Sequence, residues 1–422
     1  MTARVWAALE AVRERIWFTA AIYAVIGIAV ALVARFAAPY LPQGAAIELG
    51  SGAVDSVLTI LASSMLTVTT FSLGTVISAF FGAASNVTPR ATGLLAADGT
   101  SQRVLSTFLG AFIFSLVGII GLQSGLYDER SRFVLFVATV ALVVLIVIAM
   151  LRWIGHLNRF GLRDDTHGRI EAAAAQALAE RIEAPFLGGR PADGPPPAGA
   201  RPVLAEAVGY VRRVDIAGLD ALAARAGAAV QLAASPGGFV HLRAPLAFVW
   251  QAGEPEEEKL APAAFDARLR ECFIVEPTRA FAHDPRFGLV VMSETMEKAL
   301  SPAINDTGTV VDMLGRAVRV LSRLAERGRA EIEHPRVAVP PLSTADLIDD
   351  VFGGVARTGA AGFAVHVRLQ KALAALAGLE GAGFGPPARA VSAAALAAAT
   401  PHLAPADRAA VAALAERVAA TG

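Results

Sequence analysis

Four long apolar runs occupy the first third of the chain. They cover about residues 17–38, 54–84, 104–124 and 133–154. Each run reaches the ~20 residues that a helix needs to cross ~30 Å of hydrocarbon at 1.5 Å per residue. The first run is longer than the ~7–15-residue apolar core of a cleaved signal peptide, and further apolar runs follow it. The pattern therefore predicts four transmembrane helices within a domain of residues 1–160.

Basic residues flank these runs unevenly. Arginines precede the first run and follow the second and the fourth, whereas the loop between the first two runs has no Lys or Arg. Cytoplasmic loops carry an excess of Lys and Arg. Alanine is abundant and only three lysines occur, which is typical of a GC-rich bacterial genome. We therefore expect a protein of the bacterial inner membrane with both termini in the cytoplasm.

The second apolar run differs from the others because small and hydroxyl residues recur along it. Their spacing of three or four residues places them on one stripe of a helix. Such a stripe allows close helix packing with hydrogen bonds across the seam. It can equally line a water-filled path, and the sequence leaves both interpretations open. The stripe consists of Ser56, Thr59, Ser63, Thr67, Thr70, Gly74 and Ser78.

Asp55 is the acidic residue at the outer end of this stripe. Repeated around a symmetric oligomer, it forms a ring of carboxylates that favours cations. It can also cap the N-terminus of the helix, which is a purely structural role. The stripe itself carries no charge, so it is not a proton relay built on carboxylates.

The rest of the chain has the pattern of a soluble domain. Residues 161–201 predict an amphipathic helix followed by a Pro/Gly linker. Residues 202–253 combine short strand patterns with Gly-containing turns and predict a small β-rich barrel or sandwich. A strand is expected at Val208–Asp215 and a short helix at Ile216–Ala226. Residues 254–422 are mainly helical in pattern, with one of the helices expected at Ala345–Val355. The expected fold class is an α-helical membrane protein with four transmembrane helices and a cytoplasmic α+β domain, whose C-terminal part is helical.

Composition narrows the function mainly by exclusion. The formal net charge is zero, which argues against a broad electrostatic contact with nucleic acid. The single cysteine, Cys272, permits no disulfide within the chain and no thiolate metal cluster. The seven histidines have no ligand spacing on a common helix, and neither a phosphate-binding loop nor a nucleophile elbow occurs. We therefore expect no enzyme activity, no catalytic residue, no cofactor and no metal.

Four polar residues behind the β-rich region are the strongest candidates for chemistry: Arg279, Asp284, Asn305 and Asp306. Pro302 interrupts the helical pattern, and Asn305 or Asp306 can then cap the next helix. In a functional interpretation the break brings Asn305 and Asp306, together with Asp284, to a shared site for a cation or a small ligand. An ion pair from Arg279 to Asp284 or Asp306 that only stabilises the fold is equally consistent with the sequence.

These segments also carry a resemblance. The chain resembles a bacterial family of membrane proteins known by a domain-of-unknown-function label, to about residue 380. The shared features are the hydroxyl-rich second run and the segments Pro236–Val240, Asp284–Gly288 and Ala299–Asp306. The family often has an acid where Gly238 stands, so a role for that acid does not transfer. The resemblance implies the topology and no activity.

The function that these patterns favour is a homo-oligomeric membrane channel or channel-like transport protein. The second helix would line or flank the central path, and the cytoplasmic domain would serve as an assembly or gating module. Four helices are too few for most secondary transporters, which favours assembly around an axis. The expected partners are the lipid bilayer, further copies of the chain, and an ion or small ligand. The alternative is a membrane-anchored sensor or scaffold whose cytoplasmic domain binds a ligand or partner.

Overall fold

The protein is described by a computed structural model in which the chain forms two compact units. The N-terminal unit ends at Thr166 and the C-terminal unit begins at His167. The N-terminal arginines and most of the first loop, on which the predicted orientation depends, lie outside the described residues. The structure describes residues 16–37, 52–86, 88–96, 98–157, 163–254, 261–326, 331–359 and 361–421.

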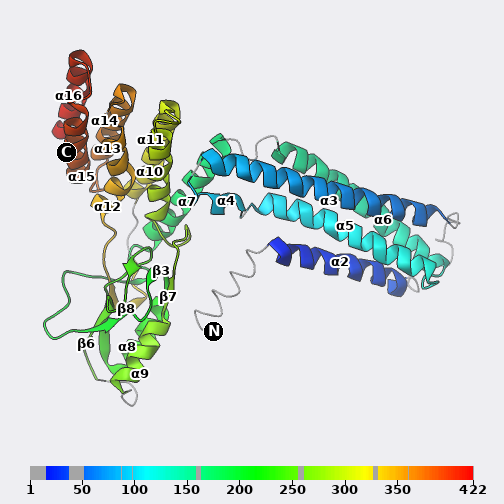
Figure 1. The fold of residues 1–422 in the computed structure, drawn as a ribbon. Coiled ribbons are helices and arrows are strands. Elements are labelled where there is room, and N and C mark those ends of the chain that lie inside the picture. Colours follow the sequence, from blue (N-terminus) through cyan, green and yellow to red (C-terminus); the bar gives the residue numbers. More distant parts are fainter. Residues whose placement is uncertain are drawn as a thin grey trace. The chain divides into compact units, whose positions relative to one another are not determined.

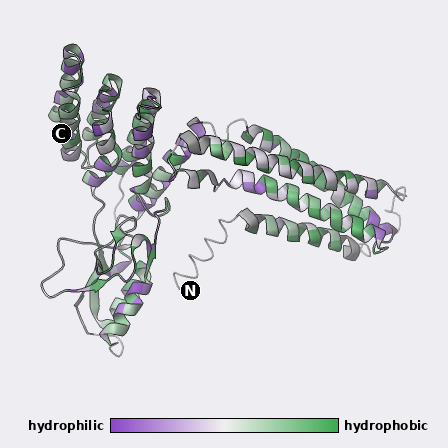
Figure 2. Cartoon of the chain, viewed as in Figure 1, coloured by the Kyte–Doolittle hydropathy of each residue, from purple (hydrophilic) through white to green (hydrophobic). Residues whose placement is uncertain are grey.

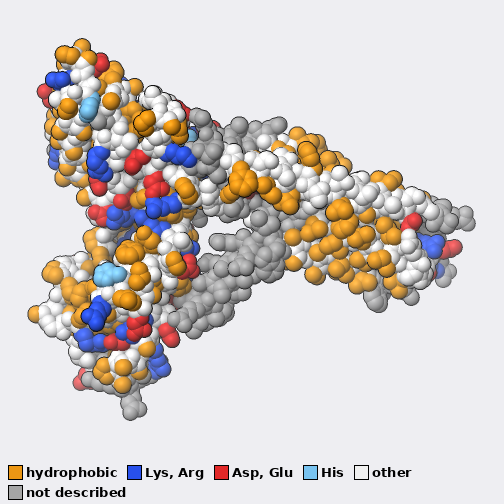
Figure 3. Space-filling model, viewed as in Figure 1, with side chains coloured by type: hydrophobic (Ala, Val, Ile, Leu, Met, Phe, Trp, Pro, Cys, Tyr) orange, Lys and Arg blue, Asp and Glu red, His pale blue; other side chains and the backbone are white. Residues whose placement is uncertain are grey.

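Helices build the N-terminal unit, and their surfaces are largely apolar (Figures 1 and 2). Hydrophobic side chains form a broad patch on the face of this unit that is visible in the space-filling view (Figure 3). The helices are α2 (Ile16–Ala37), α3 (Ala53–Asn86), α4 (Thr92–Ala96), α5 (Gly99–Gln123) and α6 (Glu129–Leu157).

Among the residues of this unit that the structure describes, three stretches are long and apolar enough to cross a membrane. They are Ala53–Gly82, Thr92–Gln123 and Glu129–Leu157. Helix α2 has 22 residues, but its qualifying apolar stretch, Ala20–Val33, is shorter. Three of the four expected spans therefore have helices of sufficient length, and the first span stays a prediction.

Small residues let α2 approach α5 closely. A Cβ atom on Gly27 would lie 2.7 Å from the carbonyl oxygen of Gly110, so only glycine fits at this crossing. The Tyr127 hydroxyl, which is buried, donates a hydrogen bond of 2.7 Å to the carbonyl of Ala31. Close backbone contact and hydrogen bonds between helices stabilise helix pairs in lipid, where the hydrophobic effect between helices is absent.

The C-terminal unit contains two sheets. The five-stranded sheet has the order β1-β8-β4-β6-β2, and the three-stranded sheet has the order β5-β3-β7. In the larger sheet β8 runs parallel to both of its neighbours, whereas the β4–β6 and β6–β2 pairs are antiparallel. The strands are β1 (Gly189–Pro191), β2 (Arg201–Leu204), β3 (Gly209–Val214), β4 (Ala228–Leu232), β5 (Phe239–Val240), β6 (Pro245–Gln251), β7 (Phe273–Glu276) and β8 (His334–Val339).

The predicted barrel is wrong for the part of the chain that the structure describes. Both sheets are open, with β1 and β2 at the edges of the larger one. Three of the strands also come from outside residues 202–253, namely β1, β7 and β8. Apolar side chains of both sheets share one core with helices α8 (Ile216–Ala226) and α9 (Pro262–Glu271). These helices cover apolar surface that a closed barrel would have buried by itself.

Helices form the remainder of the C-terminal unit, and α14 contacts α11, α15 and α16. The expected helix at Ala345–Val355 is present, but a π-helical turn interrupts it. The elements are α7 (Arg163–Glu183), α10 (Phe287–Ala299), α11 (Thr307–Ser322), the 3₁₀ turn η2 (Arg323–Glu326), α12 (Thr344–Ile348), the π turn η3 (Asp349–Gly353), α13 (Gly354–Thr358), α14 (Phe363–Ala377), α15 (Gly385–Ala399) and α16 (Pro405–Ala420).

Helix α7 is held to α10 and α11 by packing and charge. A Cβ atom on Gly288 would lie 2.4 Å from the Cβ of Ala174, so α10 and α7 meet closely. Glu171 of α7 accepts hydrogen bonds of 2.9 Å from Arg316 and 2.7 Å from Arg319. The hydrogen bond from Arg319, with help from Arg316, lowers the pKa of Glu171 despite partial burial. This network anchors the middle of α7, and the C-terminal turn of the same helix borders the site described below.

Candidate functional site

The hydroxyl stripe of α3 is exposed along its whole length. All seven of its positions, from Ser56 to Ser78, are exposed. The buried positions of α3 include Leu58 and Met65 and lie on the opposite side of the helix, which packs against α5. Within the described chain, the stripe is therefore not the seam that holds α3 to its neighbours.

Three hydroxyl groups in the middle of the stripe donate hydrogen bonds within their own helix. Thr67 donates to the carbonyl of Ser63 at 2.9 Å, and Thr70 donates to that of Thr67 at 2.9 Å. Ser63 donates to the carbonyl of Thr59 at 3.1 Å. Serine and threonine in helices often bond back to the preceding turn in this way. Because each hydroxyl oxygen still has lone pairs free to accept, the stripe can face another helix or water.

Asp55 lies in the first turn of α3. Its Oδ1 atom is buried and accepts no hydrogen bond from the part of the chain that the structure describes. The proposed cap and the proposed ring of carboxylates both stay predictions for this residue.

A polar cluster that the sequence interpretation did not identify lies where α5 begins and α6 ends. Asp98 caps α5 by accepting from the backbone N–H of Ser101 at 2.7 Å. His156 lies 2.9 Å from the same carboxylate and 3.3 Å from the Ser101 hydroxyl. A cavity of about 710 Å³ adjoins this cluster, and Arg103 and Arg152 also line it. Both the acid and the hydroxyl approach the same histidine nitrogen, so this is not the arrangement of a catalytic triad.

In the C-terminal unit, the structure joins Arg279 to Asp284. Their two hydrogen bonds measure 2.8 and 3.0 Å. The buried Asp284 carboxylate also accepts from the backbone N–H groups of Arg286 and Phe287, both at 3.1 Å. These contacts satisfy the first turn of α10, so Asp284 acts as a structural carboxylate.

Asn305 and Asp306 lie at the other end of α10. Asp306 caps α11 by accepting from the backbone N–H and the hydroxyl of Thr309 at 3.0 and 2.8 Å. The thirteen residues of α10 separate these two residues from Asp284, a distance of about 20 Å. The structure therefore places Arg279 with Asp284 before α10 and Asn305 and Asp306 after it, rather than in one shared site.

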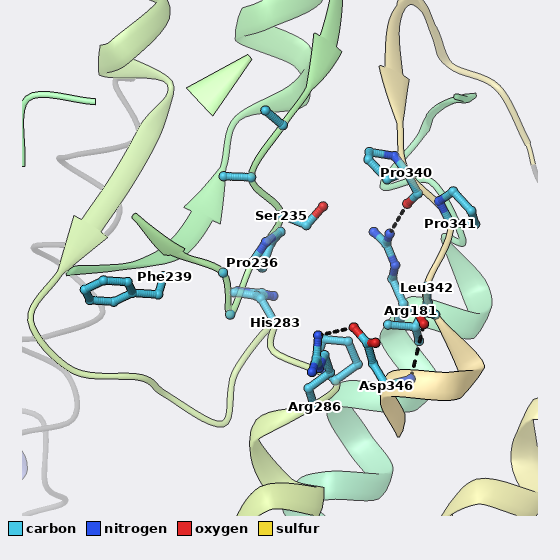
Figure 4. Close-up of a pocket in the computed structure, with 16 residues that line it drawn as sticks. Arg181, Ser235, Pro236, Phe239, His283, Arg286, Pro340, Pro341, Leu342 and Asp346 are labelled. Atoms are coloured by element: carbon cyan, nitrogen blue, oxygen red, sulfur yellow. Dashed lines mark hydrogen bonds and ion pairs between the residues drawn. The ribbon is translucent and has the colours of Figure 1, made fainter. Parts of the chain in front are cut away.

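A second cavity, of about 280 Å³, lies beside the start of α10 (Figure 4). Its walls come from the loop of residues 233–239, from residues 340–343, and from Arg181, His283 and Arg286. Arg286 pairs with Asp350 at 2.6 Å and also with Asp346. The hydrogen bonds that Arg286 donates to the Asp350 carboxylate raise the pKa of Arg286.

Sequence reasoning identified the segments around this cavity but not Arg181. The turn at Pro236–Val240 and the run Asp284–Gly288 both border it. Gly237 has φ +88°, and a Cβ there would lie 2.4 Å from an Asp284 oxygen, so the turn requires glycine. Arg181 lies within an ordinary amphipathic helix pattern, and no local signal distinguishes it from the other arginines of the chain.

Comparison with known proteins gives a family but no activity. The family description "Predicted membrane protein (DUF2254)" matches residues 13–375. The chain is similar to an uncharacterized protein of Mycobacterium tuberculosis (strain ATCC 25618 / H37Rv) and to one of Mycobacterium bovis. Each is 26% identical over 317 residues, which cover 67% of this chain and 59% of the relative. The chain thus spans less than two thirds of these relatives.

No solved structure matches the chain. The family match covers both the apolar helices and most of the C-terminal unit. The apolar helices also agree in length and composition with a membrane location. The chain therefore belongs to the DUF2254 family of predicted membrane proteins, whose function is unknown.

Proposed function

We propose that the chain assembles into a homo-oligomeric channel or channel-like transport protein of the bacterial inner membrane, with both termini in the cytoplasm. The exposed stripe of α3 lines or flanks the central path. The C-terminal unit is the assembly and gating module. The lipid bilayer and further copies of the chain are the partners, and an ion or small solute is what passes.

The exposure of the α3 stripe is the observation that supports this proposal. The stripe faces away from α5, and apolar side chains such as Val57 and Leu73 are exposed on either side of it. A polar stripe between apolar flanks suits a helix whose flanks meet neighbouring helices while the stripe meets water. At Gly74 an added Cβ would contact nothing within 4 Å, so the stripe is open at this position.

Disulfide cross-linking of the full chain tests the assembly. The only native cysteine is replaced by Cys272→Ser, and a single cysteine is then introduced by Gly74→Cys or by Leu73→Cys. Both positions are exposed, but they lie about 100° apart around the helix. We expect cross-linked dimers from Leu73→Cys, which lies on a flank that meets a neighbouring copy, and far fewer from Gly74→Cys, which faces the water-filled path. A monomer in detergent and in lipid, with equal cross-linking of both variants, would contradict the assembly.

Ion flux in liposomes that contain the purified chain tests the path. Thr67→Leu should reduce the flux because it replaces a polar stripe position by a larger apolar one. The matched control, Val57→Leu, alters an exposed apolar position on the flank of the stripe and should leave the flux unchanged. No flux at any applied voltage or membrane tension would count against a channel.

The second candidate is a membrane-anchored sensor or scaffold whose C-terminal unit binds a ligand. The cavity at Arg181 favours this function, because it lies in that unit and is lined by charged side chains. Ligand binding without any flux would support the sensor over the channel.

A further inference from the structure

The cavity beside α10 contains an arginine in an unusual environment. Arg181 is only 8% exposed and lines the cavity wall. One guanidinium nitrogen, Nη2, donates to the carbonyl of Pro340 at 3.1 Å. Its Nε atom is buried and has no hydrogen-bond partner in the described part of the chain. Arg181 thus has a buried charge with most of its hydrogen-bonding capacity unused.

The other arginines around the cavity are neutralised. Arg279 pairs with Asp284, and Arg286 pairs with Asp346 and Asp350. No carboxylate of the described residues pairs with Arg181. Burying a charge costs several kcal/mol unless an opposite charge and hydrogen bonds compensate it. An anion in the cavity would supply both.

Arg181 remains a cation at neutral pH. Burial lowers its pKa to about 10, which is the direction expected when a positive charge is removed from water. At pH 7 the side chain is therefore still protonated. A carboxylate or phosphate brought close to it would raise its pKa again.

The opposite wall provides a hydroxyl group and space. Ser235 lies across the cavity from Arg181, and its oxygen points into the space between them (Figure 4). Gly237 and Gly238 have no side chains to fill that space. Asp346 also lines the wall, but Arg286 holds its carboxylate. Arg286 also pairs with the carboxylate of Asp350. Asp350 lies in the π turn η3, and π turns occur often at functional sites.

We propose that this cavity binds a small soluble molecule that carries an oxyanion, a phosphate or a carboxylate. Arg181 supplies the charge and Ser235 a hydroxyl hydrogen bond. The cavity, of about 280 Å³, is larger than a single phosphate ion requires. The proline-rich wall at Pro340 and Pro341 would then contact the organic part of the molecule. The guanidinium group suits both anions because its N–H groups match their oxygen atoms.

Thermal unfolding and calorimetry of the purified full chain in detergent test the proposal. The probes are inorganic phosphate, citrate and glycerol phosphate, each compared with sodium chloride at the same ionic strength. We expect at least one of the three to raise the Tm of the unmodified chain. Arg181→Met keeps the length of the side chain without its charge and should weaken that binding roughly 10- to 100-fold. The matched control Arg201→Met changes a half-exposed arginine that pairs with Asp266, and it should bind as the unmodified chain does.

Two results would overturn the proposal. One is the absence of any Tm shift with all three anions. The other is an equal shift in the unmodified chain and in Arg181→Met, which would be a general salt effect. If Arg181→Met does not fold, the variant Ser235→Ala is tested instead, because Ser235 lies in a loop. Ser235→Ala should weaken binding several-fold, and unchanged affinity would contradict the proposed site. Because binding is measured without flux, the outcome is independent of the channel proposal.

Discussion

Replacing Asp284 by alanine should destabilise the C-terminal unit strongly. Its buried carboxylate holds Arg279 with two hydrogen bonds and accepts two backbone N–H groups at the start of α10. Breaking a buried ion pair costs about 3–5 kcal/mol. Arg279 is 17% exposed, so water compensates part of the lost charge partner. Losing the helix-capping contacts adds about 1 kcal/mol.

We therefore expect Asp284→Ala to lower the free energy of unfolding by about 3–4 kcal/mol. For a unit of this size, each kcal/mol shifts Tm by about 2–4 °C, so Tm should fall by roughly 6–16 °C. Thermal unfolding of the purified protein in detergent, followed by Trp fluorescence, measures this shift. Trp250 in β6 reports on the C-terminal unit.

The matched control is Asp266→Ala. Asp266 makes the same kind of two-bond pair with Arg201, at 2.7 Å for each bond, but Arg201 is 45% exposed. Exposed pairs contribute about 0–1 kcal/mol, so the control should lower Tm by only a few degrees. If Asp284→Ala loses no more stability than Asp266→Ala, burial does not determine the strength of these pairs, and the reasoning is refuted.

Three further predictions concern single residues. Burial lowers the pKa of His366 below its ordinary value of 6.5. Just below pH 6.5, this histidine is therefore protonated in the unfolded chain but not in the folded chain. Stability should therefore fall as the pH drops below about 6.5, and His366→Leu should remove this component in thermal melts from pH 8 to pH 5. Burial raises the pKa of Cys272 to about 12, so maleimide labelling at pH 7.5 should be much slower in the folded than in the denatured chain. Gly237→Ala should lower Tm more than Gly381→Ala. Both glycines have positive φ, but only at Gly237 would the new Cβ meet another side chain. Equal decreases in Tm for the two variants would show that backbone strain alone determines the loss of stability.

Local pattern determined most of the secondary structure. The helix expected at Ile216–Ala226 begins and ends at the same residues in the structure. The strand expected at Val208–Asp215 is one residue shorter at each end. Asp306 caps α11, as one of the two interpretations of that segment required. These features depend on residues within one turn or one strand of each other. Apolar periodicity, a capping carboxylate and a proline act over such distances, so they can be read along the chain.

Contacts between distant segments decided the rest. The strand β8 at His334–Val339 was not expected, and it joins the sheet only because β1 and β4 lie on either side of it. The hydroxyl stripe of α3 was visible in the sequence, but the packing of α5 on the opposite face determined that the stripe is exposed. Arg181 finds its hydrogen-bond acceptor 159 residues away, at Pro340, and finds no carboxylate in the described chain. Periodicity defines the faces of a helix, but only the tertiary structure determines which surface covers each face and which charges meet there.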